Sequence, residues 1–341
     1  MPDGMTRAAV RAPAAAATGA VILAGHLLRA VRSVGLAIEN RNTIPVLAHV
    51  LLRAENGSLV VSGTNMDQAI RDTAPCAGDL ASVTADCRAL VRLLTRLPTE
   101  AEVTLAPRPS IGGLTVGAAG LRATLMSHPA EDVPTWGLDG VGKGATHFRI
   151  PLVSLRRLLT VPAHAISTEE TRYYLNGIYL HPVTVDGAPR LRAIATDGHR
   201  LMAVDEPMPA GADGVPGVII PRQTVAALRA LLGAKAEGEV RMAVSTVKIE
   251  AELGTWTVLS KAIDGTFPEY GRVVPAQRQD GQVRVHLPGE LRRLIGLATS
   301  VATDRARRIQ LEVGKDPATP VRITTREADN GAIEVDVAAD A

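Results

Sequence analysis

One heptapeptide near the middle of the chain, Ala195-Thr-Asp-Gly-His-Arg-Leu201, brings together side chains that could carry out chemistry. Asp197 and His199 lie two residues apart, and on a β-strand this spacing would place both on one face, where a carboxylate could orient a histidine base. Covalent catalysis also needs a nucleophile within reach of that base, and no serine or cysteine motif accompanies the pair. The other interpretations are a hairpin turn that a partner binds, with Gly198 giving the backbone its freedom, and a hairpin turn without a partner.

The composition favours neither a metal nor a cofactor. The eight histidines are scattered without an HExxH pair, and the two cysteines, Cys76 and Cys87, do not have a metal-binding spacing. The segment 137–144 is similar to a phosphate-binding loop, but Gly144 stands where that loop needs serine or threonine beside Mg²⁺. We therefore expect no metal and no cofactor. Two cysteines in 341 residues, with no apolar run of membrane-spanning length, are typical of a reduced, cytoplasmic protein.

The elements that would position the heptapeptide recur along the chain. Five segments join a β-rich run to a helical pattern with apolar residues at i, i+3, i+4 and i+7, and these helices begin near residues 26, 87, 152, 222 and 289. Three strand-length runs follow each helix, so the unit is βαβββ, repeated roughly every 60 to 70 residues. One unit cannot cover both faces of its small sheet. We therefore expect an α+β fold in which pairs of units form two-layer domains.

The repeat also predicts the domain boundaries. The first two units would form one domain over residues 20–144, and the next two would form a second over residues 145–270. The fifth unit, in residues 271–341, has no partner unit and would form half of a third domain with one face of its sheet uncovered. Residues 1–19 are alanine-rich and resemble a transit peptide weakly, but we interpret them as a disordered N-terminal extension.

The predicted helices carry mostly positive charge, whereas solvated helix faces usually mix both signs. Among their few acids are Asp86, which we expect to cap the second helix, and Glu290. This pattern indicates a polyanionic partner; the alternative is an arginine-rich proteome whose side chains snorkel over the surface. Aromatic residues make up 2% of the chain, too few for single-strand stacking, and no base-reading module is visible, which leaves a duplex contacted through its backbone. The helical arginines concerned are Arg29, Arg32, Arg88, Arg92, Arg96, Arg156, Arg157, Arg222 and Arg229.

Four motifs, in their order and spacing, resemble the bacterial DNA polymerase III beta subunit, the family of sliding clamps. They are RNTIP at 41–45, RYYLNG at 172–177, ATDGHRL at 195–201 and FPEYGRVVP at 267–275, and the resemblance covers residues 20–341. It implies a non-enzymatic processivity factor in which two copies close head to tail into a ring around duplex DNA, with helices lining the hole and sheets outside. It also implies partners that bind through short linear peptides, among them the replicative polymerase, the clamp loader and repair proteins.

The same resemblance implies roles for single residues. Arg41, Tyr173 and Tyr174 would lie near the duplex; the alternative for the two tyrosines is packing in a β-strand, where adjacent residues face opposite sides. The ATDGHRL turn would border a hydrophobic pocket that accepts the linear peptides. Residues that would line this pocket are Leu175, Thr196, Gly198, His199, Arg200, Leu201, Pro268, Arg272 and Val273.

The chain departs from the family's pattern in its third domain. A clamp's third domain has two βαβββ units, and only the first is present here, so we expect the peptide pocket to be incomplete. Residues 294–305 correspond to the region that closes the family's ring. A closed dimer is therefore one of the interpretations. The alternative function is a truncated, non-closing clamp that acts as a peptide-binding module or is an inactive copy.

Overall fold

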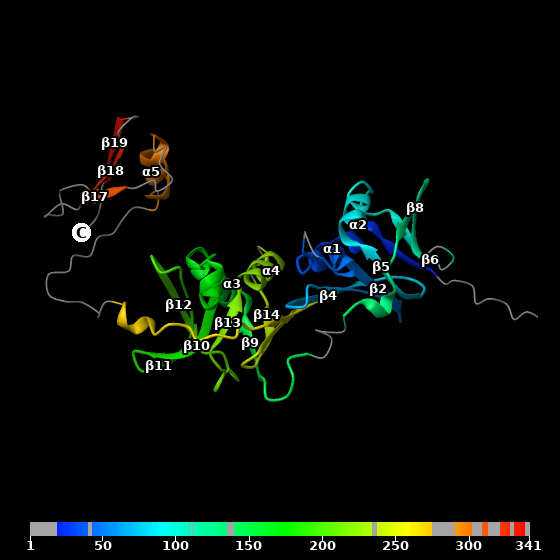
Figure 1. The fold of residues 1–341 in the computed structure, drawn as a ribbon, viewed down its shortest axis with the longest axis horizontal. Coiled ribbons are helices and arrows are strands. Elements are labelled where there is room, and N and C mark those ends of the chain that lie inside the picture. Colours follow the sequence, from blue (N-terminus) through cyan, green and yellow to red (C-terminus); the bar gives the residue numbers. More distant parts are fainter. Residues whose placement is uncertain are drawn as a thin grey trace, which may run out of the picture. The chain divides into compact units, whose positions relative to one another are not determined.

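The computed structural model describes residues 19–39, 43–108, 110, 112–134, 140–233, 237–274, 289, 291–301, 309–312, 321–327 and 331–337. Four complete βαβββ units follow one another in this part of the chain, as the repeat predicts (Figure 1). Contacts between residues divide the chain into two compact units, Met1–Pro268 and Glu269–Ala341. The domain boundaries expected from the sequence stay predictions, because the first compact unit holds two of the expected domains together.

The first two repeats exchange their leading strands. The first strand of each repeat pairs with the first post-helical strand of the other, β1 with β6 and β5 with β2, so neither repeat has a complete sheet without the other. The first repeat consists of β1 (Ala20–Leu23), α1 (Ala24–Gly35), β2 (His49–Glu55), β3 (Ser58–Thr64) and β4 (Gln68–Pro75). The second consists of β5 (Leu80–Asp86), α2 (Cys87–Leu94), β6 (Glu102–Arg108), β7 (Gly113–Ala118) and β8 (Leu121–Met126).

The helices of this pair form where their apolar spacing predicts. In α1 the residues at i, i+3, i+4 and i+7 from Leu27 are all fully buried, so one stripe of the helix packs on the sheets. The Asp86 carboxylate accepts a hydrogen bond from the amide of Ala89 at 2.6 Å and thereby caps α2, which confirms the predicted N-cap.

The third and fourth repeats exchange strands in the same way, β9 with β14 and β13 with β10. The third consists of β9 (Thr146–Pro151), α3 (Leu152–Thr160), β10 (Gly177–Val185), β11 (Ala188–Thr196) and β12 (Leu201–Pro207). The fourth consists of β13 (Val218–Pro221), α4 (Arg222–Leu232), β14 (Glu239–Val244), β15 (Lys248–Leu253) and β16 (Trp256–Lys261).

A single eight-stranded sheet, in the order β5-β2-β3-β4-β16-β15-β14-β9, runs through both pairs of repeats. Its joint is the antiparallel pairing of β4 with β16, from Gln68↔Ser260 to Asp72↔Trp256. Behind the joint, the buried hydroxyls of Thr224 and Ser260 lie 2.7 Å apart, and Thr224 donates to the side chain of Gln68 at 3.3 Å. The sheet and this buried polar cluster make the first 268 residues one compact unit.

The fifth repeat is described in part. It shows α5 (Leu291–Ala298) and a three-stranded antiparallel sheet, β17 (Gln310–Glu312), β18 (Val321–Glu327) and β19 (Gly331–Val337). Ala298, Val321 and Ile323 form its small buried core. The strand predicted before α5 falls on residues outside the described ranges, as do the N-terminal residues 1–18.

Candidate peptide-binding turn and DNA-facing helices

The heptapeptide forms the hairpin turn between β11 and β12, and Asp197 organises it. One carboxylate oxygen, Oδ1, accepts hydrogen bonds from the amides of His199 and Arg200, both at 3.0 Å, and the other accepts from Nε of Arg200 at 2.9 Å. The bond from the Arg200 amide, helped by the His199 amide and the Arg200 side chain, lowers the pKa of Asp197 below its ordinary value. A carboxylate held in this way orients a loop instead of a histidine base. The strand placement that would put Asp197 and His199 on one face is therefore wrong.

Gly198 and Thr196 complete the turn. The φ of Gly198 is +89°, a backbone conformation that a residue with a Cβ rarely adopts, which confirms the role expected for this glycine. The Thr196 hydroxyl accepts from the Gly198 amide at 3.1 Å and donates to the Arg200 carbonyl at 2.8 Å. The exposed Gly198, His199 and Arg200 are thus presented to solvent on a turn that these hydrogen bonds hold.

Sequence reasoning missed one neighbour of this turn, Arg172. A Cβ built on Gly198 would lie 3.1 Å from a guanidinium nitrogen of Arg172, so the segment η5 (Glu170–Leu175) lies beside the turn. Arg172 also pairs with Glu169, with 3.2 Å between Nε and Oε2. It is the first residue of the RYYLNG motif, which could have pointed to it.

The predicted pocket residues fall into three groups. Thr196, Gly198, His199, Arg200 and Leu201 come together in the turn and at the start of β12. Leu175, at the end of η5, is buried, whereas Pro268, the last residue of the first compact unit, is exposed. Arg272 and Val273 belong to the second compact unit, where Val273 is 70% exposed and Arg272 pairs with Glu269 at 3.1 Å.

Tyr173 and Tyr174 lie in η5, a short 3₁₀ segment, so the alternative of packing within a β-strand is wrong. Their rings meet edge to face with centroids 5.8 Å apart, and Tyr173 is 54% exposed. Gly265 allows this arrangement, because a Cβ there would lie 2.9 Å from the Cβ of Tyr174. The exposed phenol of Tyr173 is available to a partner.

The predicted DNA-facing arginines divide by their contacts. The exposed arginines on α2 and α4 are Arg88, Arg92, Arg222 and Arg229. Arg96 is also exposed, but it lies two residues past the end of α2. The predicted spacing of four on one helix face therefore applies to Arg88 and Arg92 only. Arg32 donates to the hydroxyl of Thr95 at 3.2 Å, and Arg156 is partly buried. Arg41 lies outside the described residues.

Two of these arginines already have carboxylate partners. Arg29 donates to both carboxylate oxygens of the fully buried Asp72, at 3.0 and 2.8 Å, and to the hydroxyl of Thr255 at 2.9 Å. Arg157 donates to Glu206 at 2.9 Å, and Glu206 also accepts from the hydroxyl of Ser154 at 2.8 Å. These partners reduce the charge that either arginine can offer to DNA.

Reactive and metal-binding groups are scarce in the part of the chain that the structure describes. Within it, no three His, Cys, Asp or Glu side chains gather closely enough to hold a metal ion. Both cysteines are free, and burial raises the pKa of the Cys87 thiol to about 11, which leaves it protonated and unreactive. None of the helices in the described ranges has the length and apolar character needed to cross a membrane.

Two family models match this chain. The N-terminal domain of the DNA polymerase III beta subunit matches residues 21–136, and its central domain matches residues 149–269. The Beta sliding clamp of Caulobacter vibrioides (strain NA1000 / CB15N) is 37% identical over 313 residues, which are 91% of this chain and 82% of that protein. The chain belongs to the DNA polymerase III beta subunit family, the beta sliding clamps. The Beta sliding clamp of Pseudomonas aeruginosa is 33% identical over 84% of this chain and 76% of its own length.

Solved clamp structures share the fold as well. A crystal structure of the C. crescentus beta sliding clamp matches with a TM-score of 0.86 and 35% identity, over 95% of this chain and 84% of that chain. The clamp from Bartonella birtlesii bound to griselimycin matches with a TM-score of 0.84 and 32% identity, over the same shares of the two chains. The α+β fold expected from the repeat and the clamp fold implied by the family resemblance are confirmed. The chain functions as a processivity clamp and not as an enzyme.

Proposed function

We propose that two copies of this clamp close head to tail into a ring that encircles duplex DNA without sequence preference. The observation that carries the proposal is the set of exposed arginines on α2 and α4, Arg88, Arg92, Arg222 and Arg229, which occupy the second helix of each pair of repeats. Water-separated arginines attract phosphates without reading bases, so they hold a duplex and still allow it to slide.

Retention on circular DNA tests the ring. A loaded ring stays on a nicked circular plasmid and leaves once the plasmid is cut, so we expect cutting to release the wild-type clamp. Arg88→Glu with Arg92→Glu should weaken retention on the plasmid. The dependence of log affinity on log salt concentration should also become less steep, by the equivalent of about two phosphate contacts. The matched control, Arg53→Glu with Arg122→Glu, reverses one exposed strand arginine in each of the first two repeats and should behave as the wild type. Unchanged retention in the helix variant would refute the role of these arginines.

We also propose that the turn from Thr196 to Leu201 binds short linear peptides of the replicative polymerase, the clamp loader and repair proteins. In support, the turn is hydrogen-bonded and exposed, and the half-buried Leu201 offers apolar surface beside it. His199→Ala should weaken the binding of a fluorescent polymerase-derived clamp-motif peptide, measured by anisotropy, and leave DNA retention of a preloaded ring unchanged. Equal peptide affinity in the variant would argue against this surface.

The solution mass tests the dimer directly. We expect light scattering over a range of concentrations to give twice the mass of the chain. A monomer at every concentration would contradict a closed ring of two copies and would favour a half-clamp that binds peptides.

A further inference from the structure

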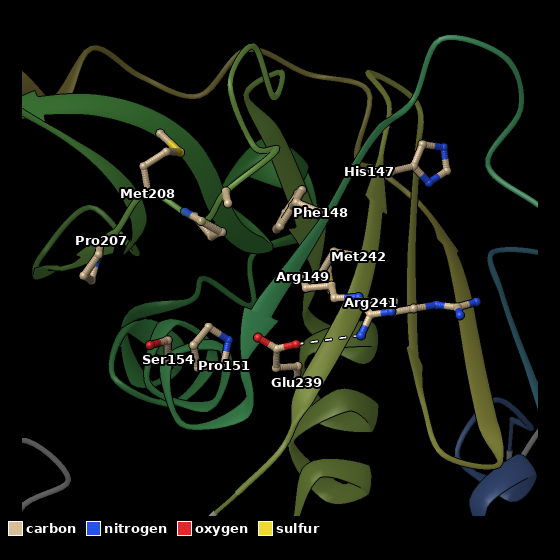
Figure 2. A pocket seen from close by; sticks show the side chains of 12 residues that line it. His147, Phe148, Arg149, Pro151, Ser154, Pro207, Met208, Glu239, Arg241 and Met242 are labelled. Carbon is tan, nitrogen blue, oxygen red and sulfur yellow. Dashed lines mark ion pairs between the residues drawn. The ribbon is translucent and has the colours of Figure 1, made fainter.

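The second pair of repeats contains a cavity of about 800 Å³ that none of the roles above uses (Figure 2). It lies between β9 and β14 on one side and, on the other, the segment 207–210, which begins at the last residue of β12. Its floor is apolar: Phe148 and Met242 are buried, and Met208 is half-buried. Its rim carries His147 and three charged residues, Arg149, Arg241 and Glu239.

One wall of the cavity is the open edge of a sheet. β9 is the last strand of the eight-stranded sheet, so one side of its backbone has no neighbouring strand among the described elements. The amide of Leu152 donates to the carbonyl of Gly238 at 2.9 Å, which makes this a hydrogen-bonded pair at the end of the β9–β14 ladder. Because such pairs alternate along an antiparallel ladder, the amides and carbonyls of His147 and Arg149 point to the open side.

Two neighbours define how much of this edge is available. Pro151 has no amide hydrogen, and it occupies an outward position by the same alternation, as prolines of edge strands do. A Cβ built on Gly211 would lie 3.1 Å from the carbonyl oxygen of His147, so the segment after β12 closes the groove at that end. The outward amide and carbonyl of Arg149 lie between these limits.

The charges on the rim favour an acidic ligand. Arg149 and Arg241 are direct cross-strand partners in a pair without hydrogen bonds, where side chains lie closest and like charges repel. Arg241 forms an ion pair with Glu252 at 2.7 Å. Arg149 lies 3.8 Å from Glu239, and the side chains of Arg149 and Glu239 are both more than half exposed. A ligand carboxylate could therefore replace Glu239 at Arg149 and relieve the repulsion between the two guanidinium groups.

We infer that this groove binds an acidic, extended peptide, which adds a strand to the open edge of β9. One apolar side chain of the peptide packs against Phe148, Met208 and Met242, and the next side chain, which faces the other side of the sheet, places a carboxylate between Arg149 and Arg241. The groove and the turn at Thr196–Leu201 lie at opposite ends of β12, about 20 Å apart at the usual rise per residue. The inference does not depend on the peptide role proposed for that turn.

Two labelled peptides and methionine-methyl NMR test the inference on the full chain. The probe alternates acids and apolar residues, Ser-Glu-Leu-Glu-Val-Glu-Ser, and its partner has lysine in place of each glutamate. We expect the acidic peptide to bind at least about tenfold more tightly, and to shift the methyl signals of Met208 and Met242 but not those of Met66 and Met126. Equal binding of the two peptides, or shifts that leave Met208 and Met242 unmoved, would overturn the inference.

Two substitutions at one position separate the charge from the backbone. Arg149→Gln removes the charge and keeps the amide, whereas Arg149→Pro also removes the outward amide while leaving the β14 ladder intact, so the proline variant should bind the acidic peptide more weakly than the glutamine variant. Arg53→Gln is the control for a strand arginine elsewhere, and His199→Ala is the control for the turn; both should bind the acidic peptide as the wild type does. Equal affinity of Arg149→Gln and Arg53→Gln would contradict the charged contact. If the proline variant has a lowered melting temperature, Arg241→Gln gives the same test of the charge without touching the edge backbone.

Discussion

The carboxylate of Asp197 holds the turn together, because it accepts three hydrogen bonds from within the turn. The sequence predicts the turn and its glycine from the motif alone. It could not predict that Asp197 bonds within the turn, since the same residue types at the same spacing also suit an active site. That choice depends on the backbone path, which places both residues between β11 and β12 and not within a strand.

Replacing Asp197 tests this role. Asp197→Ala leaves two turn amides and the Arg200 guanidinium without their acceptor, so we expect the free energy of unfolding to fall by about 1 kcal/mol and clamp-motif peptides to bind several-fold more weakly. Denaturant unfolding and peptide anisotropy measure the two effects. Asp213→Ala, at an exposed loop position, should change neither. A variant with wild-type peptide affinity would show that the turn keeps its shape without this carboxylate.

Two histidines make stability depend on pH. Burial and the neighbouring His128 lower the pKa of His49 below its ordinary value of 6.5, and burial lowers the pKa of His181 as well. The unfolded chain therefore takes up protons before the folded chain does, and the free energy of unfolding should fall as the pH drops below 6.5 toward the folded-state pKa values. Well above pH 6.5 both histidines are neutral in either state and contribute no slope.

His49→Gln tests the pH dependence. Denaturant unfolding between about pH 8 and about pH 5 should show a shallower fall in stability for the variant than for the wild type. His26→Gln, at an exposed position of α1, serves as the control and should follow the wild-type curve. Parallel curves for the wild type and the His49 variant would contradict the lowered pKa.

At the scale of elements, the sequence predicts the helices well because their apolar periodicity is local. The predicted starts near residues 26, 87, 152, 222 and 289 compare with observed starts at 24, 87, 152, 222 and 291. Local patterns could not reveal the partners of two arginines: Asp72 lies 43 residues from Arg29 along the chain, and Glu206 lies 49 residues from Arg157. The 3₁₀ form of η5 was also missed, since its tyrosines favour strands by propensity.

The contact between α1 and β4 can be tested at Asp72. Asp72→Ala removes a buried carboxylate that accepts hydrogen bonds from Arg29 and from the amide of Thr73. We expect this change to lower the free energy of unfolding by about 2 to 3 kcal/mol. The loss is smaller than for a fully buried ion pair because Arg29 is partly exposed. Asp67→Ala provides a matched control at the same joint. Asp67 is mostly exposed and pairs with Lys261 at 3.1 Å, so its loss should cost less than about 1 kcal/mol. Similar losses in the two variants would contradict the importance of burial here.

At the scale of the whole molecule, the eight-stranded sheet couples the first four repeats. Repeat counting predicts two separate domains over residues 20–270, but it cannot show that β4 and β16 join them, because this pairing links residues that are 184 to 192 positions apart in the chain. The two strands pair over five residues, from Gln68↔Ser260 to Asp72↔Trp256, so opening either domain exposes the edge strand of the other.

We therefore expect the first two domains to unfold together. In native-state hydrogen exchange, amides of β4 and β16 should open with the same free energy, and that value should equal the global free energy of unfolding of the unit Met1–Pro268. Amides of β12, an edge strand, should exchange sooner. Exchange of β4 well before β16 would show that the first domain opens by itself.

The direction of the joint also determines how it responds to force. β4 and β16 are antiparallel and pair over five residues, and their hydrogen bonds lie across the strands. Tension along the strands loads all of these bonds at once in shear, whereas tension across the strands peels them apart one at a time. A clamp pulled by a moving polymerase would thus resist force along the strands better than force across them. The direction in which a partner pulls would therefore determine whether β4 and β16 stay paired.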